Sequence, residues 1–307
     1  MKPTFIMMVG LPGSGKSTLA VKLAKEYDAI IVSSDEIRRE LYGDAECQDN
    51  PEMIFREMHK RSKEALLDGK SVVYDATNIN RKHRKHTLDA LPKCAKIAQI
   101  VWAKYATCVA QDAQRERKVG EAVIKRMIKQ FQAPYYDEGF SEIRIWINGD
   151  KYDREDYRNW MDCPHDNPHH TNTVKEHTDN VCELIQKYIP DKYTVQDDNI
   201  QGAMGFILYL AAALHDAGKK FTKSFINSKG EKTEIAHYYQ HHNVSGYYAL
   251  GYRPLDDIGM SMMEKMLVVW LVNNHMDPFF NTKYYRSINQ GHRELLDMLH
   301  DCDVKGA

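Results

Sequence analysis

The stretch GLPGSGKST at residues 10–18 constrains the fold of this chain more than any other feature. It fits the pattern G-x-x-x-x-G-K-[ST], with an apolar run of β type before it and a helical stretch after it. Glycines let the backbone N–H groups of such a loop turn inward around phosphate oxygens, and the following helix adds positive potential at its N-terminus. The sequence therefore predicts a nucleoside triphosphate site within an α/β domain.

The loop residues have separate expected roles. Lys16 is expected to reach the β- and γ-phosphates, and the Ser17 hydroxyl is expected to bind Mg²⁺. The predicted cofactors of this site are ATP and Mg²⁺. The predicted ATP-binding residues are Gly10, Pro12, Gly13, Ser14, Gly15, Lys16, Ser17 and Thr18, joined by Arg115 and Arg117 from a later segment.

The hydrophobic pattern changes near residue 148. Before it, almost wholly apolar β-type runs alternate with amphipathic stretches, which is typical of a parallel sheet with helices on both faces. Beyond it, apolar residues recur at helical spacing and no run is a convincing strand. We expect strands at 4–9, 29–34, 71–75, 96–103 and 142–147, and helices near 17–27, 51–68, 81–91, 107–118, 121–132, 172–189, 200–214, 238–250, 259–274 and 292–304. The sequence predicts an α/β domain over residues 1–150 and an all-α domain over residues 165–307.

The composition limits the cellular compartment and the classes of partner that we expect for this chain. No run approaches the length of a membrane span, and the six cysteines form no Cys-x-x-Cys pair, so we expect a reduced cytoplasmic setting without a membrane partner. Cys163 and His165 are possible metal ligands, although a lone pair of this kind is usually incidental. The net charge of the chain is −1, but residues 1–150 carry 25 Lys and Arg against 21 Asp and Glu, and this balance of +4 permits a nucleic-acid partner without requiring one. The basic run RKHRKH at 81–86 is a candidate contact for a nucleic-acid backbone, or a solvated surface.

Two polar clusters follow the loop. Asp35 and Arg38, after the second predicted strand, are candidates for the base that accepts a hydroxyl proton and for a grip on an acceptor phosphate. A helix-capping aspartate with a solvated arginine is the alternative. Arg115 and Arg117 precede a helix, and arginines there can stabilise charge on a transferred phosphoryl group. A solvated basic helix face is equally compatible with them.

The motifs GLPGSGKST, SSDEIRRE and VVYDATNINRKHR, with the arginine-bearing segment, resemble the phage-type polynucleotide 5′-kinase domain over roughly residues 1–148. The resemblance implies that Asp35 is the general base, that Arg38 binds a 3′-phosphate of the acceptor, and that Asp75 supports the acceptor site. It implies donor contact by an arginine that matches Arg115. Gln111-Asp112 stands where the family tends to have Arg-Asn, which leaves the choice between Arg115 and Arg117 open.

Histidine is concentrated in the second half, which holds 11 of the 14. His215 and Asp216 end the apolar run MGFILYLAAAL, and both are common metal ligands. Further ligands are available beside other predicted helices, as a site inside a helix bundle requires. The candidate ligands are His177, His215, Asp216, His241, His275 and Asp303, with Asp301 as the competitor of Asp303. Four imidazoles among six ligands favour one or two transition-metal ions, such as Mn, Ni, Co, Zn or Fe, over Mg²⁺ or Ca²⁺.

The order His…His-Asp…His…His…Asp resembles the HD phosphohydrolase superfamily over roughly residues 165–307. The resemblance implies that Asp216 bridges two metals, that Lys219 meets substrate phosphate, and that the metals activate water for attack on phosphorus. His170, His237 and His242 are weaker candidates, for phosphate contact or for second-sphere or surface positions.

Together the two resemblances imply a polynucleotide end-healing enzyme. Such an enzyme would phosphorylate a 5′-OH and remove a 2′,3′-cyclic phosphate or a 2′(3′)-phosphate, with RNA or DNA ends as its substrates and a separate ligase as a candidate partner. Two alternatives stay open. One is a small-molecule kinase joined to an HD nucleotide phosphohydrolase, and the other is an NTP-dependent RNA-binding regulator.

Overall fold

A computed structural model describes residues 2–43, 50–167, 172–188 and 200–307. Within them, contacts divide the chain into two units, which are described separately. Unit 1 consists of Met1–Met127 and Pro134–Lys151, and unit 2 consists of Ile128–Ala133 and Tyr152–Ala307. The chain therefore passes from one unit to the other three times.

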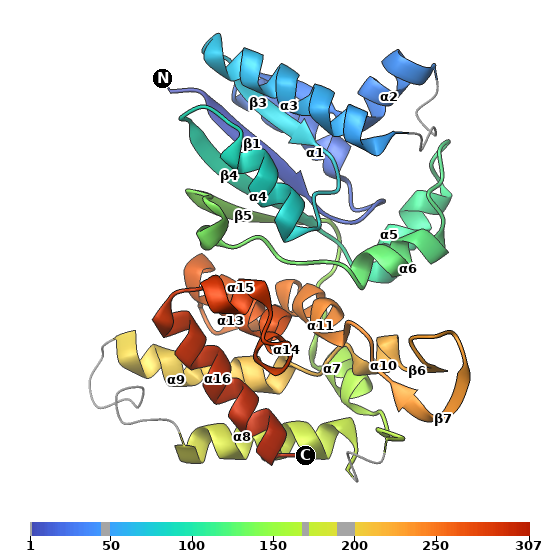
Figure 1. Ribbon diagram of the computed structural model, residues 1–307, viewed down its shortest axis with the longest axis vertical. Helices are drawn as coiled ribbons and strands as arrows, with labels where there is room; N and C mark the ends of the chain where they lie inside the picture. Colours follow the sequence, from blue (N-terminus) through green and yellow to red (C-terminus); the bar gives the residue numbers. More distant parts are fainter. Residues whose placement is uncertain (1, 44–49, 168–171, 189–199) are drawn as a thin grey trace. The chain divides into compact units, whose positions relative to one another are not determined.

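Unit 1 is built on a parallel sheet with the strand order β2-β3-β1-β4-β5 (Figure 1). Its strands are β1 (Thr4–Val9), β2 (Ala29–Ser33), β3 (Ser71–Asp75), β4 (Ala95–Trp102) and β5 (Glu142–Ile147). Its helices are α1 (Lys16–Glu26), α2 (Ser34–Tyr42), α3 (Pro51–Leu67), α4 (Arg81–Asp89), α5 (Tyr105–Ala113), α6 (Glu121–Ile128) and the short 3-10 helix η1 (Tyr136–Glu138). The predicted α/β fold with a parallel five-stranded sheet is confirmed for the described residues.

Successive side chains along each strand point to opposite faces of the sheet, and apolar side chains on both faces pack against helices. Ile6 and Met8 of β1 pack with Val73 of β3 against Leu19 and Leu23 of α1 on one face. Tyr74, which points to the other face, stacks on His59 of α3 with ring centroids 6.2 Å apart. The carboxyl ends of β1, β2 and β3 meet at one edge, where ligands of open α/β sheets bind.

Unit 2 is largely helical (Figure 1). Its helices are α7 (Arg154–Met161), α8 (Val174–Tyr188), α9 (Ile200–Leu214), α10 (Lys219–Thr222), α11 (His241–Leu250), α12 (Arg253–Asp257), α13 (Met262–Asn274), α14 (Asp277–Phe280), α15 (Lys283–Ser287) and α16 (Gln290–Lys305). Helices α11 and α13 pack together and are buried over most of their length, so they form the centre of the unit. None of the helices in the described residues combines the length and the apolar character that crossing a membrane requires.

Unit 2 also contains a hairpin that the sequence-based expectation of a wholly helical region missed. Strands β6 (Ser224–Ile226) and β7 (Lys232–His237) pair antiparallel. Asn227 fixes the turn between them, because its side-chain oxygen accepts hydrogen bonds from the amides of Lys229 and Glu231. A three-residue strand is too short for the apolar pattern to reveal, although the turn sequence NSKG was a usable signal.

A short segment, residues 128–133, joins unit 2 from an early part of the chain, and we call it the strap. Phe131 is fully buried, and its ring meets the Tyr247 ring edge-on at 5.0 Å. Asn273 donates to the Phe131 carbonyl and accepts from the Ala133 amide at 2.8 Å, and Asn243 donates to the Lys129 carbonyl at 2.8 Å. The predicted helix over 121–132 therefore ends at Ile128, where the chain extends into these contacts.

Candidate active sites

The phosphate loop lies between β1 and α1, and two close approaches require its glycines. A Cβ at Gly10 would lie 2.4 Å from the Val101 carbonyl oxygen, and one at Gly13 would lie 2.1 Å from the Cys108 carbonyl oxygen. Ser14 is fully buried, and its hydroxyl has no hydrogen-bond partner among the described residues. The loop therefore presents polar groups in a shape that fits triphosphate oxygens.

Lys16 is almost completely buried, and its Nζ donates a hydrogen bond to the Leu11 carbonyl at 2.7 Å. Burial lowers the pKa of Lys16 to about 8, although the charge of Asp75 opposes this shift. Asp75 ends β3 beside the loop, and its carboxylate forms a hydrogen bond with the Ser17 hydroxyl. Burial raises the pKa of Asp75, while Lys16 and Ser17 oppose that rise. The sequence placed Asp75 with the acceptor residues, whereas the structure brings it next to Lys16 and Ser17.

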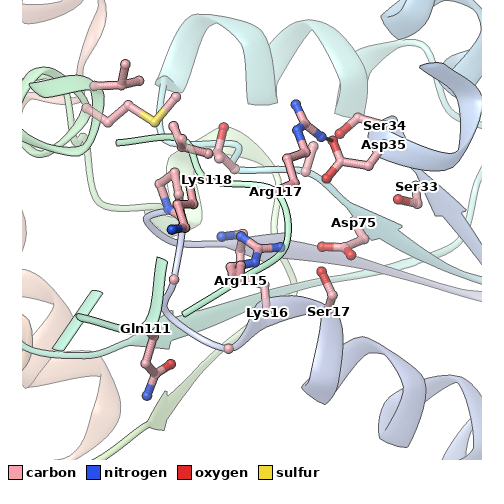
Figure 2. A pocket seen from close by; sticks show the side chains of 18 of the residues that line it. Lys16, Ser17, Ser33, Ser34, Asp35, Asp75, Gln111, Arg115, Arg117 and Lys118 are labelled. Atoms are coloured by element: carbon pink, nitrogen blue, oxygen red, sulfur yellow. Dashed lines mark ion pairs between the residues drawn. The ribbon is translucent and has the colours of Figure 1, made fainter. Parts of the chain in front are cut away.

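Asp35 lies in the first turn of α2. The sequence predicted a strand over 29–34, whereas β2 ends at Ser33, two residues before Asp35. Two guanidinium groups contact its Oδ1 atom. Arg38 Nη1 lies at 3.0 Å. Arg117 Nη1 lies at 2.8 Å, and Figure 2 shows this residue beside Asp35. Asp35 and Arg38 line the same cavity of about 770 Å³ as Lys16 and Ser17. A carboxylate held by arginines across a cavity from the phosphate loop is suited to receive a proton from a hydroxyl acceptor.

The segment between α5 and α6, residues 114–120, carries both candidate lid arginines. Arg115 lies close enough to Lys16 and Asp75 for its charge to influence the pKa of each, and Arg117 contacts Asp35 (Figure 2). The two arginines therefore face different groups in the cavity. Asp112 fixes this segment, because its buried carboxylate accepts hydrogen bonds from the amide of Val119 and, at 2.8 Å, from that of Gly120. The predicted helix over 107–118 accordingly ends at Ala113.

The basic run at 81–86 is only partly a surface. Arg84 is fully buried, and its guanidinium donates to both carboxylate oxygens of Glu138, at 2.8 and 2.7 Å. Arg81 is also buried, whereas Lys82 and Lys85 are exposed. Two of the six residues are thus internal, because positions 81 and 84 share the face of α4 that packs inward.

Four histidines converge in unit 2. The side chains of His177, His215 and His275 are buried, as is most of His241. The Nε2 atoms of His177 and His215 lie 3.3 Å apart, and those of His241 and His275 lie 3.0 Å apart. They come from α8, from the segment after α9, from the start of α11 and from the end of α13. Close groups of metal-ligand atoms include His177, His215 and Asp216, and Asp216, His241 and His275.

The other ring nitrogens show why these pairs suit a metal. Each Nδ1 faces a backbone carbonyl: Gly306 for His177, Ala212 for His215, Tyr238 for His241 and Val272 for His275. A carbonyl oxygen only accepts hydrogen bonds, so each Nδ1 must donate, and a neutral ring then has its lone pair at Nε2. Lone pairs that face each other at 3.0–3.3 Å repel unless a cation lies between them. These residues fit metal ions held through Nε2, with the backbone fixing the tautomer.

Asp216 lies between the two histidine pairs. Its Oδ1 is 3.2 Å from His241 Nε2, and its Oδ2 is 3.3 Å from His215 Nε2. Asp303 adds a second carboxylate, with Oδ1 2.9 Å from His177 Nε2, whereas Asp301 is exposed. Burial lowers the pKa of His215, but Asp216 and Asp303 outweigh burial and raise that pKa to about 10. The carboxylates therefore favour positive charge among these rings.

Lys219 begins α10, and its Nζ is 2.6 Å from Asp216 Oδ2. Among the weaker candidates, His237 stacks on Tyr239 and His242 is next to His241, where burial lowers the pKa of His242 to about 3. His170 lies outside the described residues. The sequence favours an incidental role for His165, but the residue is buried and its Nε2 lies 3.1 Å from Lys219 Nζ, within hydrogen-bond distance.

A match to a protein family lies in the first half of the chain. Residues 5–134 match the family described as AAA domain. Among solved structures, a chain of the Pnkp1/Rnl/Hen1 RNA repair complex is 22% identical, with a TM-score of 0.39, over 42% of this chain and 43% of that one. A gluconokinase from Sinorhizobium meliloti is 16% identical, with a TM-score of 0.36, over 48% and 83% of the two chains. A fungal RNA kinase is 13% identical, with a TM-score of 0.38, over 68% and 50%.

This chain therefore spans half or less of the repair-complex chain and of the fungal kinase. No curated protein matches it. The phosphate loop, the parallel sheet and the match to the AAA domain family are together typical of a P-loop α/β domain, and such a fold implies ATP and Mg²⁺.

Proposed function

We propose that the chain is an RNA end-healing enzyme with two activities. Residues 1–150 would form an ATP-dependent polynucleotide 5′-hydroxyl kinase domain. Residues 165–307 would form an HD-type domain with metal-dependent 2′,3′-cyclic phosphodiesterase and 2′(3′)-phosphatase activity. The observation that carries the proposal is the presence of two sites in one chain, each built for phosphorus chemistry from different residue types: arginines and a carboxylate beside a phosphate loop, and paired imidazoles around a carboxylate.

The kinase step is assigned to residues that line one cavity. Asp35 accepts the proton of the 5′-hydroxyl as the new P–O bond forms and the bond to ADP breaks, while Arg38 and Arg117 hold the Asp35 carboxylate in place. Lys16 and Arg115 stabilise the charge on the transferred phosphoryl group. Ser17 and Asp75 offer oxygen ligands for Mg²⁺, which would neutralise charge on the β- and γ-phosphates.

The phosphoesterase step is assigned to the buried cluster in unit 2. His177, His215 and Asp303 would hold one ion, and His241 and His275 would hold a second, while Asp216 contacts residues of both sets. Bound transition ions would supply Lewis acidity and lower the pKa of water. Lys219 binds the non-bridging oxygens of the substrate phosphate and orients the phosphorus atom.

The two proposed activities would act on the two ends of a single RNA break. Cleavage of RNA by attack of its own 2′-hydroxyl leaves a 5′-OH end and a 2′,3′-cyclic phosphate end. Ligation needs a 5′-phosphate and a free 3′-OH, so a separate ligase is the expected user of the products.

The test combines labelled substrates with two matched variants. We expect transfer from γ-labelled ATP to a 5′-OH oligoribonucleotide but not to a nucleoside, and phosphate release from an oligonucleotide with a 2′,3′-cyclic end. Lys16→Ala should abolish transfer and keep release, and Asp216→Ala should do the reverse. Chelation should remove the release activity, and Mn²⁺, Ni²⁺ or Co²⁺ should restore it.

Each alternative function has its own outcome. Phosphorylation of nucleosides or sugars but not of oligonucleotides would indicate a small-molecule kinase, and the absence of any acceptor would indicate a regulator. If folded, metal-loaded Lys16→Ala lost both activities, the assignment of two separate sites would be wrong.

A further inference from the structure

We propose that His165 is a positioning residue, which holds the Lys219 ammonium group so that one of its N–H bonds is directed to the phosphate of the substrate. The proposal rests on the phosphoesterase function proposed above and extends it to a residue that the six-ligand pattern does not contain. Four observations support it: the tautomer of His165, the anchoring of its loop, the contacts of the Lys219 ammonium group, and the place of His165 outside the ligand clusters.

The hydrogen bonds of His165 determine its role. Only 2% of the residue is exposed, and its Nδ1 lies 2.6 Å from the Asn172 carbonyl oxygen. Since a carbonyl only accepts, Nδ1 must donate, and the neutral ring carries its lone pair at Nε2. Lys219 Nζ lies 3.1 Å from that Nε2, so the lysine donates and the imidazole accepts.

The loop that carries His165 is anchored to the hairpin. The Tyr238 hydroxyl donates to the His165 carbonyl, and the Ala236 amide donates to the Asp166 carbonyl at 2.8 Å. Lys223 forms an ion pair with the Asp166 carboxylate at 2.7 Å. The β6–β7 hairpin thus gives the imidazole a fixed position, which a positioning residue needs because a 1 Å error can cost ~10²-fold in rate.

The contacts of the Lys219 ammonium group show how its orientation is restrained. An ammonium group has three N–H donors. One is directed to His165 Nε2 at 3.1 Å. The ammonium group also forms an ion pair with Asp216, with 2.6 Å between Nζ and Oδ2, although this contact does not have the geometry of a hydrogen bond. The Tyr238 ring flanks the same nitrogen at 5.6 Å. Because one donor is committed to His165 and the ion pair with Asp216 restrains the buried side chain, the ammonium group is oriented before substrate arrives, so little rotamer freedom remains to be lost on binding.

His165 differs from the candidate metal ligands in what its Nε2 contacts. The close groups of ligand atoms in the described residues contain His177, His215, Asp216, His241 and His275, but not His165. Its ring meets the His177 ring edge-on at 5.7 Å, so it packs beside the cluster. Removing its ring nitrogen should therefore affect phosphate binding and leave metal content unchanged.

The test uses the full chain loaded with Mn²⁺ or Co²⁺ and inorganic phosphate as the probe. We expect His165→Ala to raise the Kd for phosphate, measured by calorimetry, and the KM for a phosphomonoester about tenfold, the scale of one hydrogen bond to a charged group. The kcat should change much less, and metal content should equal that of wild type. His165→Gln, which retains an acceptor on its side chain, should recover part of the affinity. His300→Ala, a matched imidazole deletion in the same unit, should behave as wild type.

A double-mutant cycle separates positioning from an independent contribution. His165→Ala combined with Lys219→Ala should be no worse than Lys219→Ala alone. Additive losses would overturn the proposal, as would loss of metal in His165→Gln, which would make His165 a ligand. If the wild type binds phosphate but hydrolyses no ester, the phosphoesterase function fails, and the phosphate affinities of the same variants still decide the role of His165.

Discussion

At the scale of single residues, Asp35 is the side chain on which the kinase assignment depends most. Arg38 and Arg117 both contact its Oδ1 atom, so the carboxylate is oriented in the cavity by two charged partners. An amide at this position keeps the shape of the side chain but cannot take a proton from a hydroxyl.

We therefore expect Asp35→Asn to lower 5′-phosphorylation by ~10²-fold or more, the scale of general base catalysis, while the affinity for ATP stays within a few fold. Single-turnover transfer from labelled ATP measures the first quantity, and calorimetry measures the second. Glu36→Gln is the matched control, because the Glu36 carboxylate is exposed on the same helix turn. Turnover like that of wild type in Asp35→Asn would remove Asp35 from the base role.

Substitution of Arg115 and of Arg117 should affect different substrates of the phosphorylation reaction. Arg115 acts on Lys16 and Asp75, whereas Arg117 contacts Asp35. Removing a hydrogen bond to a charged group typically costs about tenfold or more. Arg115→Ala should therefore raise the KM for ATP or lower kcat at saturating acceptor, and Arg117→Ala should raise the KM for the acceptor with the ATP affinity unchanged. The opposite pattern, measured by varying each substrate in turn, would exchange the two roles.

The sequence predicted several of these residues because their chemistry is local. The phosphate loop follows from its own spacing, and Asp35 with Arg38 follows from one helical turn. The partner of Arg117 depends on where residues 114–120 fold back, which no local pattern encodes. His165 was undervalued for the same reason: its partner Lys219 is 54 positions away, and only the folded chain joins them.

At the scale of elements, the arginine-bearing segment is held by one buried side chain. Asp112 accepts hydrogen bonds from the amides of Val119 and Gly120, which closes a loop around both arginines. This aspartate departs from the Arg-Asn of the polynucleotide-kinase pattern. Its effect, the early end of α5, was not predictable, because the bonds run to amides beyond the expected end of the helix.

Asp112→Ala should release this segment and lower kcat/KM for phosphorylation about tenfold, since the guanidinium groups would no longer be held in place. The global stability of unit 1 should fall less than the activity does, because the sheet and its core are untouched. Glu116→Ala removes an exposed carboxylate from the same segment and serves as the control. Equal activity of the two variants would show that the Asp112 bonds do not position the arginines.

At the scale of the whole molecule, the strap makes the core of unit 2 depend on residues far from it in sequence. Phe131 is fully buried against Tyr247, and two asparagines of α11 and α13 bond to the strap backbone. The sequence predicted the boundary near residue 150 from the change in hydrophobic pattern, and a six-residue excursion leaves no trace in that pattern.

Phe131→Ala should destabilise unit 2 by about 3–5 kcal/mol, the usual cost of deleting a buried phenyl ring. Denaturant unfolding measures this, and ligands identify the transitions: Mn²⁺ should raise the midpoint of unit 2, and ATP with Mg²⁺ that of unit 1. Phe279→Ala, at a ring that is 64% exposed, should shift neither midpoint by much. A shift confined to the ATP-sensitive transition would contradict the assignment of the strap to unit 2.

The strap also limits where recombination can divide the gene without disrupting the fold of unit 2. Because residues 128–133 belong with residues 152–307, a single crossover near residue 150 would carry away most of unit 2 without a piece of its core. Clean exchange of either half for a homologue needs several breakpoints at once. The topology therefore favours transmission of the two units as a linked pair.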